Sequence, residues 1–244
     1  MSVELPGLHL GAATRWQRAT VVERRSETAT AATFRLRTGT PLAHRPGQHL
    51  VVRLTAPDGY KASRAYSIAS APDGGAEVEI TVERLDEGEV STFLHDDLRR
   101  GDEIEVRGPI GGFVWEADVP SLLVGGGSGV VPLASMVRNA RRLGRADRAE
   151  LLVSVRTPAD LYYAAEMQAP GVTVVYTRAA PLGARRPPGR LVAADVLPLI
   201  EGRVGSVLAF VCGPSGFVEA VGELLVTGGV PPEHVRVETF GPTG

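Results

Sequence analysis

Residues 121–132, with the sequence SLLVGGGSGVVP, decide how the second half of this chain folds. The stretch opens as a short apolar run typical of a buried strand, and it turns through glycines toward a predicted helix that starts at Pro132. Glycine has no Cβ, so a ligand can approach closely, and a helix N-terminus offers free N–H groups to a pyrophosphate. We therefore interpret the turn as a phosphate-binding loop whose contacts come from Gly126, Gly127, Ser128 and Gly129. A plain tight turn is the alternative, since Val130 stands where the common dinucleotide pattern has its third glycine.

Apolar runs and helical stretches alternate along the whole second half of the chain. The predicted strands are Ser121–Val124, Leu151–Val155, Val172–Tyr176, Val207–Val211 and Val235–Glu238. The predicted helices are Pro132–Leu143, Ala159–Met167 and Phe217–Thr227. Buried strands that alternate with helices favour a mostly parallel sheet with helices on its faces. We expect an α/β domain over residues 118–244, with its boundary in the segment Val114–Pro120.

The first half of the chain has a different sequence pattern, in which turns separate short predicted strands. Alternating runs predict strands at Ala19–Glu23, Thr33–Arg37, Leu50–Leu54, Val78–Val82 and Glu103–Val106. This pattern predicts an antiparallel β-barrel or sandwich over residues 1–117. One helix interrupts the strands at Ser91–Arg99. We expect Ser91 to be its N-cap and its apolar face to consist of Phe93, Leu94 and Leu98.

The composition excludes several classes of function. Of the 244 residues 43% are apolar, and 26 basic against 28 acidic residues leave a formal charge of −2. This balance gives no electrostatic basis for binding nucleic acid or for a polybasic membrane anchor. The single cysteine, Cys212, excludes an intramolecular disulfide and an iron–sulfur cluster held by these residues alone, and the five scattered histidines predict no metal site. The N-terminus lacks the features of a secretory signal, so we expect a cytoplasmic protein.

The stretch Arg64-Ala65-Tyr66-Ser67 follows a turn and is predicted to be a strand. In a strand, Arg64 and Tyr66 project to one face and Ser67 projects to the other. An arginine two residues from a tyrosine can pair with a phosphate while the aromatic ring stacks on a flat heterocycle. Cross-strand packing beside a surface arginine is the alternative explanation.

Several short motifs share one order along the chain: Arg64–Ser67, Gly88–Thr92, Gly108–Phe113, the glycine turn, Cys212–Pro214 and Glu238–Phe240. Their order and spacing resemble the ferredoxin–NADP(H) reductase superfamily, whose members join an FAD-binding barrel to a nicotinamide-nucleotide domain. The resemblance covers nearly the whole chain. It implies an antiparallel β-barrel domain for FAD, followed by an α/β domain with a parallel sheet for NAD(P).

On the FAD side, the resemblance implies roles for two motifs. Arg64 would bind the flavin phosphate, Tyr66 would stack on the isoalloxazine ring, and Ser67 would lie near the flavin N5 atom. Ala65 belongs to the same flavin-binding strand. The segment 88–92 resembles the stretch that cradles the FAD pyrophosphate through Gly88, Val90, Ser91 and Thr92.

On the nicotinamide side, Cys212-Gly213-Pro214 resembles the loop that guides the nicotinamide ring toward the flavin. Four further residues resemble the positions at which NADP-specific relatives bind the 2′-phosphate: Arg156, Thr177, Arg178 and Arg190. Planar arginines suit a doubly charged phosphate. Because no acidic residue ends either of the two strands before these positions, we expect NADP, with NAD as the alternative.

Two residues near the C-terminus complete the implied site. Phe240 resembles the terminal aromatic residue that covers one face of the flavin. A Phe replaces Tyr or Trp here and residues 241–244 extend past it, so either Phe240 or this tail would cover the ring. Glu238 matches a glutamate that relatives place near the contact between flavin and nicotinamide, and an exposed strand carboxylate is the alternative. The resemblance thus implies three residues close to the chemistry: Ser67, Cys212 and Glu238.

The expected function is that of a flavoprotein reductase with FAD and NADP as cofactors. A hydride would pass from NADPH to FAD, and electrons would leave singly to a separate acceptor, since these residues hold no cluster. By family analogy this partner would be a ferredoxin that supplies a cytochrome P450 or an oxygenase. The alternatives are a free-flavin or ferric reductase and a non-catalytic electron-transfer subunit of a larger complex.

Overall fold

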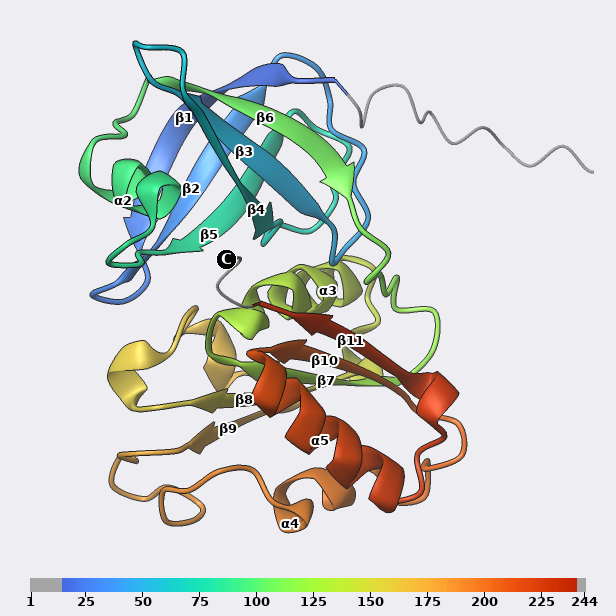
Figure 1. Cartoon of the computed structure of the whole chain (residues 1–244). Helices are drawn as coiled ribbons and strands as arrows, with labels where there is room; N and C mark the ends of the chain where they lie inside the picture. Colours follow the sequence, from blue (N-terminus) through green and yellow to red (C-terminus); the bar gives the residue numbers. More distant parts are fainter. Residues whose placement is uncertain (1–14, 241–244) are drawn as a thin grey trace, which may run out of the picture.

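The computed structural model describes residues 15–240 and divides them between two sheets (Figure 1). The strands of the first half form a six-stranded antiparallel sheet, and those of the second half form a five-stranded parallel sheet. The predicted fold class, an antiparallel barrel followed by an α/β domain, is confirmed. The domain boundary between residues 117 and 118 stays a prediction, and it falls in the connection between the two sheets.

The first sheet is a barrel with the strand order β4-β3-β6-β1-β2-β5. Its strands are β1 (Gln17–Ser26), β2 (Ala31–Thr38), β3 (His49–Thr55), β4 (Lys61–Ser67), β5 (Glu77–Glu83) and β6 (Glu103–Ile110). A bridge between Ile68 and Ile80 joins the chain just after β4 to β5, and the Ala69 N–H donates to the Glu79 carbonyl at 2.7 Å. The two edges of the sheet meet there, which closes the barrel.

Helix α2 (Glu89–Asp96) packs on the barrel core through Val90 and Leu94. The predicted N-cap is wrong, because the helix begins after Gly88 and Ser91 lies inside its first turn. The Ser91 hydroxyl donates to the Gly88 carbonyl at 3.1 Å and therefore caps nothing. Phe93, which was predicted on the apolar face, is 39% exposed, and the helix ends at Asp96 instead of Arg99.

The parallel sheet has the order β11-β10-β7-β8-β9, with helices on both faces. Its strands are β7 (Ser121–Gly126), β8 (Ala149–Val155), β9 (Val172–Tyr176), β10 (Leu208–Gly213) and β11 (Val235–Thr239). Helix α3 (Val130–Arg142) covers the face toward the barrel, while α4 (Ala193–Val196) and α5 (Ser215–Thr227) cover the other face (Figure 1). Side chains alternate between these faces, so that Leu123 joins the α3 core and Leu122 joins the α5 core.

Two predicted helices differ from the structure. The helix expected from Pro132 begins at Val130, directly after a 3-10 turn at Gly127–Gly129, so the proline lies within the first turn. The helix expected over Ala159–Met167 is wrong, because two short 3-10 turns replace it. Between these turns Tyr163 takes a φ of +54°, a left-handed conformation that interrupts an α-helix.

The contact between barrel and α/β domain, which we call the seam, is packed with side chains from both. The core around α3 also contains Ala69 and Phe113 from the barrel side. The rings of Phe113 and Phe210 meet edge to face, with their centroids 5.4 Å apart. The seam is therefore a packed surface that fixes α3 against the barrel.

Candidate active site

The glycine turn connects β7 to α3 at the carboxyl edge of the parallel sheet. Gly125 and Gly126 still pair as strand residues with the neighbouring strands, so the turn begins at Gly127, later than the sequence indicated. Residues Gly127–Gly129 lead straight into α3, and no side chain of the described residues caps this start. The first N–H groups of such a start have no acceptor within the helix, and a pyrophosphate fits them.

Close packing requires glycine at two positions of this turn. A Cβ on Gly129 would lie 2.1 Å from the carbonyl oxygen of Cys212, and a Cβ on Gly126 would lie 2.7 Å from the ring of Phe217. At Gly127, whose φ is +55°, a Cβ would meet no atom within 4 Å. The turn thus packs tightly against β10 and α5 and leaves space in front of Gly127.

Strands β10 and β11 bring Cys212 and Glu238 together beside the glycine turn. These two residues are partners in the parallel register, and Cys212 is also the partner of Gly125 on β7. Cys212 is completely buried, and burial, reinforced by the nearby Glu238 carboxylate, raises the pKa of its thiol. Burial also raises the pKa of Glu238 to about 7. The site therefore holds a neutral thiol next to a carboxyl group that changes its charge near neutral pH.

Phe240 lies where β11 ends and packs against the core at the seam. Its N–H donates to the Gly213 carbonyl at 3.0 Å, which holds it next to the end of β10. Pro214 follows there as the N-cap residue of α5. The tail 241–244, which was considered as an alternative cover for the flavin, lies outside the described residues.

The stretch Arg64–Ser67 forms the second half of β4. Arg64 is exposed, while Tyr66 is half-buried on the barrel core and burial raises the pKa of its phenol. Ser67 is 4% exposed, and its Oγ has no hydrogen-bond partner among residues 15–240. A buried hydroxyl without a partner costs free energy, so this position suits a ligand that supplies the missing hydrogen bond.

The segment 88–92 begins α2, and in the described part of the chain no side chain caps this helix start. The two hydroxyls expected to bind phosphate are both bound to the backbone of Leu85, just before the segment. Ser91 accepts from the Leu85 N–H at 3.2 Å, and Thr92 donates to the Leu85 carbonyl at 3.2 Å. The segment therefore offers its backbone N–H groups as donors. The Tyr60 hydroxyl donates to Glu89 at 3.2 Å, which ties this helix start to the hairpin that leads into β4.

The chain just after β4 is held by the helix that begins at the glycine turn. The Ser135 hydroxyl donates to the Ser70 carbonyl at 2.7 Å, and the Arg138 guanidinium donates to the Ala69 carbonyl at 2.8 Å. One helix thus connects the strand that carries Arg64–Ser67 with the turn that carries the glycines. Figure 1 shows both at the seam.

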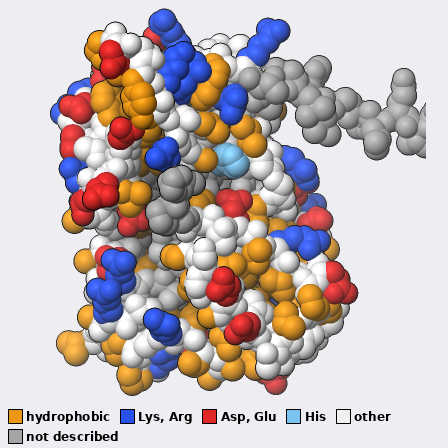
Figure 2. Space-filling model, viewed as in Figure 1, with side chains coloured by type: hydrophobic (Ala, Val, Ile, Leu, Met, Phe, Trp, Pro, Cys, Tyr) orange, Lys and Arg blue, Asp and Glu red, His pale blue; other side chains and the backbone are white. Residues whose placement is uncertain are grey.

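The predicted 2′-phosphate residues gather at the edge where β8 and β9 end: Arg156, Thr177, Arg178 and Arg190. The Arg178 N–H donates to the Arg156 carbonyl at 2.9 Å, so these residues are neighbours. The Gly189 N–H donates to the Tyr176 carbonyl at 3.0 Å, which brings the loop with Arg190 to the same edge. All three arginines are exposed, and Figure 2 shows basic side chains on this side of the α/β domain.

Residues on both sides of the seam fit the two nucleotide cofactors that the sequence implies. On the barrel, the unpartnered Ser67 hydroxyl, the half-exposed ring of Tyr66 and the uncapped α2 start fit a flavin with its pyrophosphate. On the α/β domain, the uncapped glycine turn with open space at Gly127 fits a second dinucleotide. Ligands of open parallel sheets bind at this carboxyl edge.

Two protein families match this chain, one in each half. Residues 18–115 match the family described as oxidoreductase FAD-binding domain, and residues 123–223 match the oxidoreductase NAD-binding domain. The chain belongs to the ferredoxin–NADP(H) reductase superfamily. The FAD- and NAD-binding domains of this reductase-superfamily member occur in the order that the sequence predicts.

Two curated relatives of this superfamily member are reductase components of oxygenase systems. The ferredoxin–NAD(P)⁺ reductase component of naphthalene 1,2-dioxygenase/salicylate 5-hydroxylase systems from Ralstonia is 29% identical over 86% of this chain and 65% of its own length. The ferredoxin reductase component of 3-ketosteroid-9-alpha-monooxygenase from Rhodococcus rhodochrous is 32% identical over 81% of this chain and 56% of its own. The chain spans 55% to 70% of the length of the curated relatives it matches first.

A solved structure shows the same two-domain fold. The flavohem-like FAD/NAD-binding domain of nitric oxide dioxygenase from Vibrio cholerae O1 biovar El Tor aligns with a TM-score of 0.83. The alignment covers 93% of this chain and 99% of that one, at 24% identity. The similarity therefore concerns the fold of both domains together.

The residues that join the two domains cannot be predicted from sequence motifs. Ser135, Arg138 and Tyr163 all bind across the seam, yet none of them belongs to a motif. The available signal was weak: Ser135 and Arg138 lie three residues apart and share a helix face, but their acceptors are backbone carbonyls of the other domain.

The described residues contain neither a helix that could span a membrane nor a cluster that could hold a metal ion. Among residues 15–240 no helix has both the length and the apolar character that a bilayer crossing requires. Within the same range no three His, Cys, Asp or Glu side chains cluster closely enough to hold a metal ion.

Proposed function

We propose that this chain is a reductase that moves electrons from NADPH through FAD to a separate one-electron acceptor. The observation that carries the proposal is the position of Cys212, Glu238 and the glycine turn at one edge of the parallel sheet. Helix α3, which starts at this edge, also holds the chain that follows Ser67. Two nucleotide sites on opposite sides of one packed seam suit transfer between two bound rings.

When bound, FAD supplies the redox chemistry, because its N5 accepts a hydride and the reduced flavin can release electrons one at a time. On the barrel, we assign Arg64 to the flavin phosphate, Tyr66 to the ring face and Ser67 to a hydrogen bond at N5. The start of α2 at Gly88, with Val90, Ser91 and Thr92, would donate backbone N–H groups to the pyrophosphate. Ala65 lies between the phosphate and ring contacts.

On the α/β domain, the N–H groups of residues 126–129 would bind the pyrophosphate of the nicotinamide nucleotide. Cys212 is completely buried, and its raised pKa keeps the proton on Sγ, so the thiol adds no charge beside the pocket. Glu238, with a pKa of about 7, can hold a proton on its carboxyl group near neutral pH. Gly213 and Pro214 would complete the wall of the nicotinamide pocket, and Phe240 would cover one face of the flavin.

The arginines at the ends of β8 and β9 favour NADP over NAD. A 2′-phosphate carries up to two negative charges, and exposed guanidinium groups can bind it through charge-assisted hydrogen bonds. Asp160 is the first acidic side chain after the end of β8, and it accepts from the Thr157 N–H and hydroxyl at 2.9 and 2.7 Å. That carboxylate is used in the local turn, which supports a phosphate-binding edge.

A ferredoxin that supplies a P450 or an oxygenase is the acceptor we propose. Two curated relatives are named ferredoxin reductases of oxygenase systems, and these 244 residues contain a single cysteine, too few for a cluster of their own. We further propose a cytoplasmic location, since NADPH is supplied inside the cell.

The test is reduction of the purified, FAD-loaded protein under anaerobic conditions. We expect bleaching of the flavin absorbance by NADPH faster than by NADH, and cytochrome c reduction that rises when an added ferredoxin is present. Parallel assays with free flavin and ferric citrate test the alternative acceptors. A protein that binds no FAD, or that reduces free flavin while ferredoxin has no effect, would contradict the proposal.

A further inference from the structure

Two side chains of α3 hold the barrel across the seam, and we call this pair the clamp: Ser135 and Arg138. Ser135 donates to the Ser70 carbonyl at 2.7 Å, and Arg138 donates to the Ala69 carbonyl at 2.8 Å. Arg138 is an unusual choice for a partly buried position, since only 16% of its side chain is exposed. A buried guanidinium persists only where its partners offset the loss of hydration.

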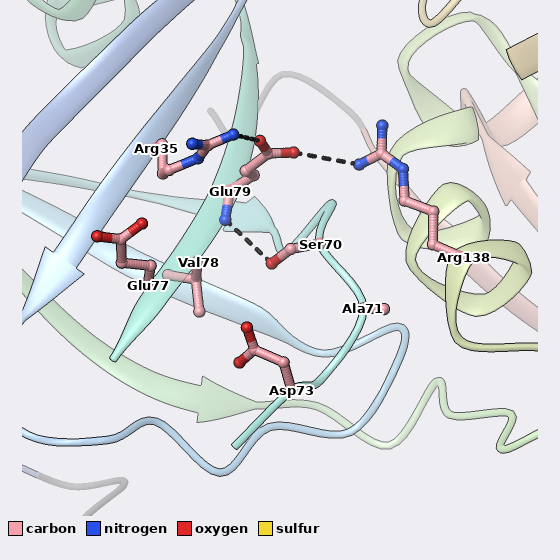
Figure 3. Close-up of a pocket in the computed structure, with 8 residues that line it drawn as sticks. All are labelled: Arg35, Ser70, Ala71, Asp73, Glu77, Val78, Glu79 and Arg138. Carbon is pink, nitrogen blue, oxygen red and sulfur yellow. Dashed lines mark hydrogen bonds and ion pairs between the residues drawn. The ribbon is translucent and has the colours of Figure 1, made fainter. Parts of the chain in front are cut away.

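Those partners come from both domains, which makes Arg138 the centre of a network. Its fork binds both carboxylate oxygens of Glu166 at 3.0 and 2.5 Å, and it lies 3.3 Å from Glu79 on β5. Figure 3 shows Glu79 between Arg138 and Arg35, with the Arg35 ion pair at 3.2 Å. A bidentate ion pair fixes the orientation of the guanidinium as well as its position.

Tyr163 provides a second connection next to the first. Its ring lies under the Arg138 guanidinium, 4.5 Å from centroid to carbon, and its hydroxyl is 2.5 Å from the Thr81 hydroxyl on β5. Its N–H donates to Glu27 of the barrel at 3.1 Å. The left-handed backbone at this residue is therefore held by bonds to the other domain.

The clamp connects the two parts of the chain that carry the proposed nucleotide sites. Ala69 and Ser70 follow Ser67 by two and three residues, and α3 starts at the glycine turn. A helix is stiff, and the nine residues from Gly129 to Arg138 span about 13 Å at 1.5 Å per residue. The clamp thus fixes the chain after β4 to helix α3, and the glycine turn lies at the start of the same rigid helix.

We infer that Arg138, supported by Ser135, is a positioning residue that sets the distance and angle between the flavin and the nicotinamide for hydride transfer. The inference rests on the proposed function. It follows because hydride transfer is sensitive to small displacements, and a shift of about 1 Å between reactants can slow a reaction about a hundredfold.

A cavity lies beside the clamp, so a smaller side chain in place of Arg138 would weaken the contact between the two domains. A cavity of about 360 Å³ opens there, lined in part by Arg35, Ser70, Glu79 and Arg138 (Figure 3). Without the Arg138 guanidinium, water from this cavity would reach Glu79, and hydration of that carboxylate would replace its ion pair across the seam. The two domains would then be joined with a wider range of orientations.

The test compares Arg138→Ala with Arg141→Ala in the FAD-loaded protein. Arg141 lies on the same helix and pairs with Glu166 at 3.4 Å, but its side chain binds no barrel residue in the described range, so it is a matched control for lost charge. We expect Arg138→Ala to keep its FAD and its affinity for NADPH within about twofold. The rate of flavin reduction at saturating NADPH, measured by stopped flow, should fall about tenfold or more, whereas Arg141→Ala should stay within twofold.

A conservative variant separates positioning from a general loss of structure. Arg138→Lys keeps a donor for the Ala69 carbonyl but lacks the two-pronged contact with Glu166, so its rate should lie between those of wild type and Arg138→Ala. If Arg138→Ala loses FAD or unfolds, Ser135→Ala removes a single hydrogen bond and should still slow flavin reduction about threefold at unchanged NADPH affinity.

The outcomes separate this inference from the proposed function. If wild type is not reduced by NADPH or NADH, the proposed function itself is wrong. If NADPH reduces wild type, and reduces Arg138→Ala and Ser135→Ala as fast as wild type, the positioning role is overturned. A loss confined to NADPH affinity, with the saturated rate unchanged, would overturn it as well.

Discussion

The two proposed pyrophosphate sites use helix starts in different ways. At residues 125–129 the backbone packs so closely on β10 that a Cβ on Gly129 would collide with the Cys212 carbonyl. At residues 88–92 the helix start is shaped by side chains, since Ser91 and Thr92 bind the Leu85 and Gly88 backbone around it. The first site depends on close approach of backbone to backbone, and the second depends on hydroxyls that bind the backbone around it.

This difference determines which substitutions each site tolerates. A turn built by close backbone approach cannot accept an added methyl group, because the neighbouring strand cannot move away without disturbing the sheet. A turn built by hydroxyls loses about one hydrogen bond per substitution and keeps its path. The predictions below test this contrast, beginning with the largest expected effect.

Gly129→Ala should lower the free energy of unfolding by about 3 kcal/mol and abolish tight binding of NADPH, because the new Cβ lies on the Cys212 carbonyl. Urea unfolding and nucleotide titration measure the two effects. The matched control is Gly222→Ala in α5, where a Cβ meets no atom within 4 Å. This control should be more stable than wild type by about 0.5 kcal/mol. Equal stabilities for the two variants would contradict the close-packing argument.

Arg178→Ala tests the phosphate edge of the α/β domain. Loss of a charge-assisted contact with the 2′-phosphate, worth about 1.5 kcal/mol, should reduce the preference for NADPH over NADH about tenfold. The ratio of kcat/KM values for the two nucleotides measures this preference. The NADH value is the internal control and should not change. An unchanged ratio would remove Arg178 from the 2′-phosphate site.

Ser67→Ala and Ser91→Ala should change stability in opposite directions. Without flavin, Ser67→Ala removes a buried hydroxyl that has no partner within residues 15–240, and we expect a gain of about 1 kcal/mol. Ser91→Ala removes a hydroxyl with two partners and should cost about 1 kcal/mol. Thermal unfolding of the flavin-free variants measures both. With FAD bound, Ser67→Ala should reduce the rate of flavin reduction, and a loss of stability in this variant would refute the assignment.

Glu238→Gln should change how stability depends on pH. Burial raises the pKa of Glu238 in the folded protein to about 7, above its ordinary value. Its contribution to stability is therefore complete below the unfolded pKa, and it is lost as the pH rises through about 7. The melting temperature of wild type relative to Glu238→Gln should fall between pH 5 and pH 8. A constant difference across this range would show that the carboxyl group does not titrate there.

Much of the fold followed from local patterns in the sequence. The apolar runs around residues 121–126 and 208–213 are buried strands of a parallel sheet, which their lack of polar alternation indicated. The pairing of Cys212 with Glu238 also follows from topology, because the carboxyl ends of parallel strands meet at one edge. Ala159–Met167 failed as a helix because bonds from Tyr163 to Thr81 and Glu27, far away in the sequence, favour another backbone conformation.

The candidate site was predictable to a smaller extent. Motifs indicated Arg64–Ser67 and the glycine turn, but nothing in a linear sequence tells that Ser67 lacks a partner or that Glu238 is half-buried. The contacts of the clamp could not be predicted from the sequence for the same reason. Arg138 binds a carbonyl 69 residues away, and any residue type could have supplied that acceptor.

The direction of β11 has a practical consequence for protein engineering. This strand runs toward the seam, and Phe240 is fixed there by its bond to the Gly213 carbonyl. An affinity tag or a fused redox module attached directly to Phe240 would therefore begin beside the proposed nicotinamide pocket. A bulky addition would block access, whereas an electron carrier on a short linker would arrive close to its donor.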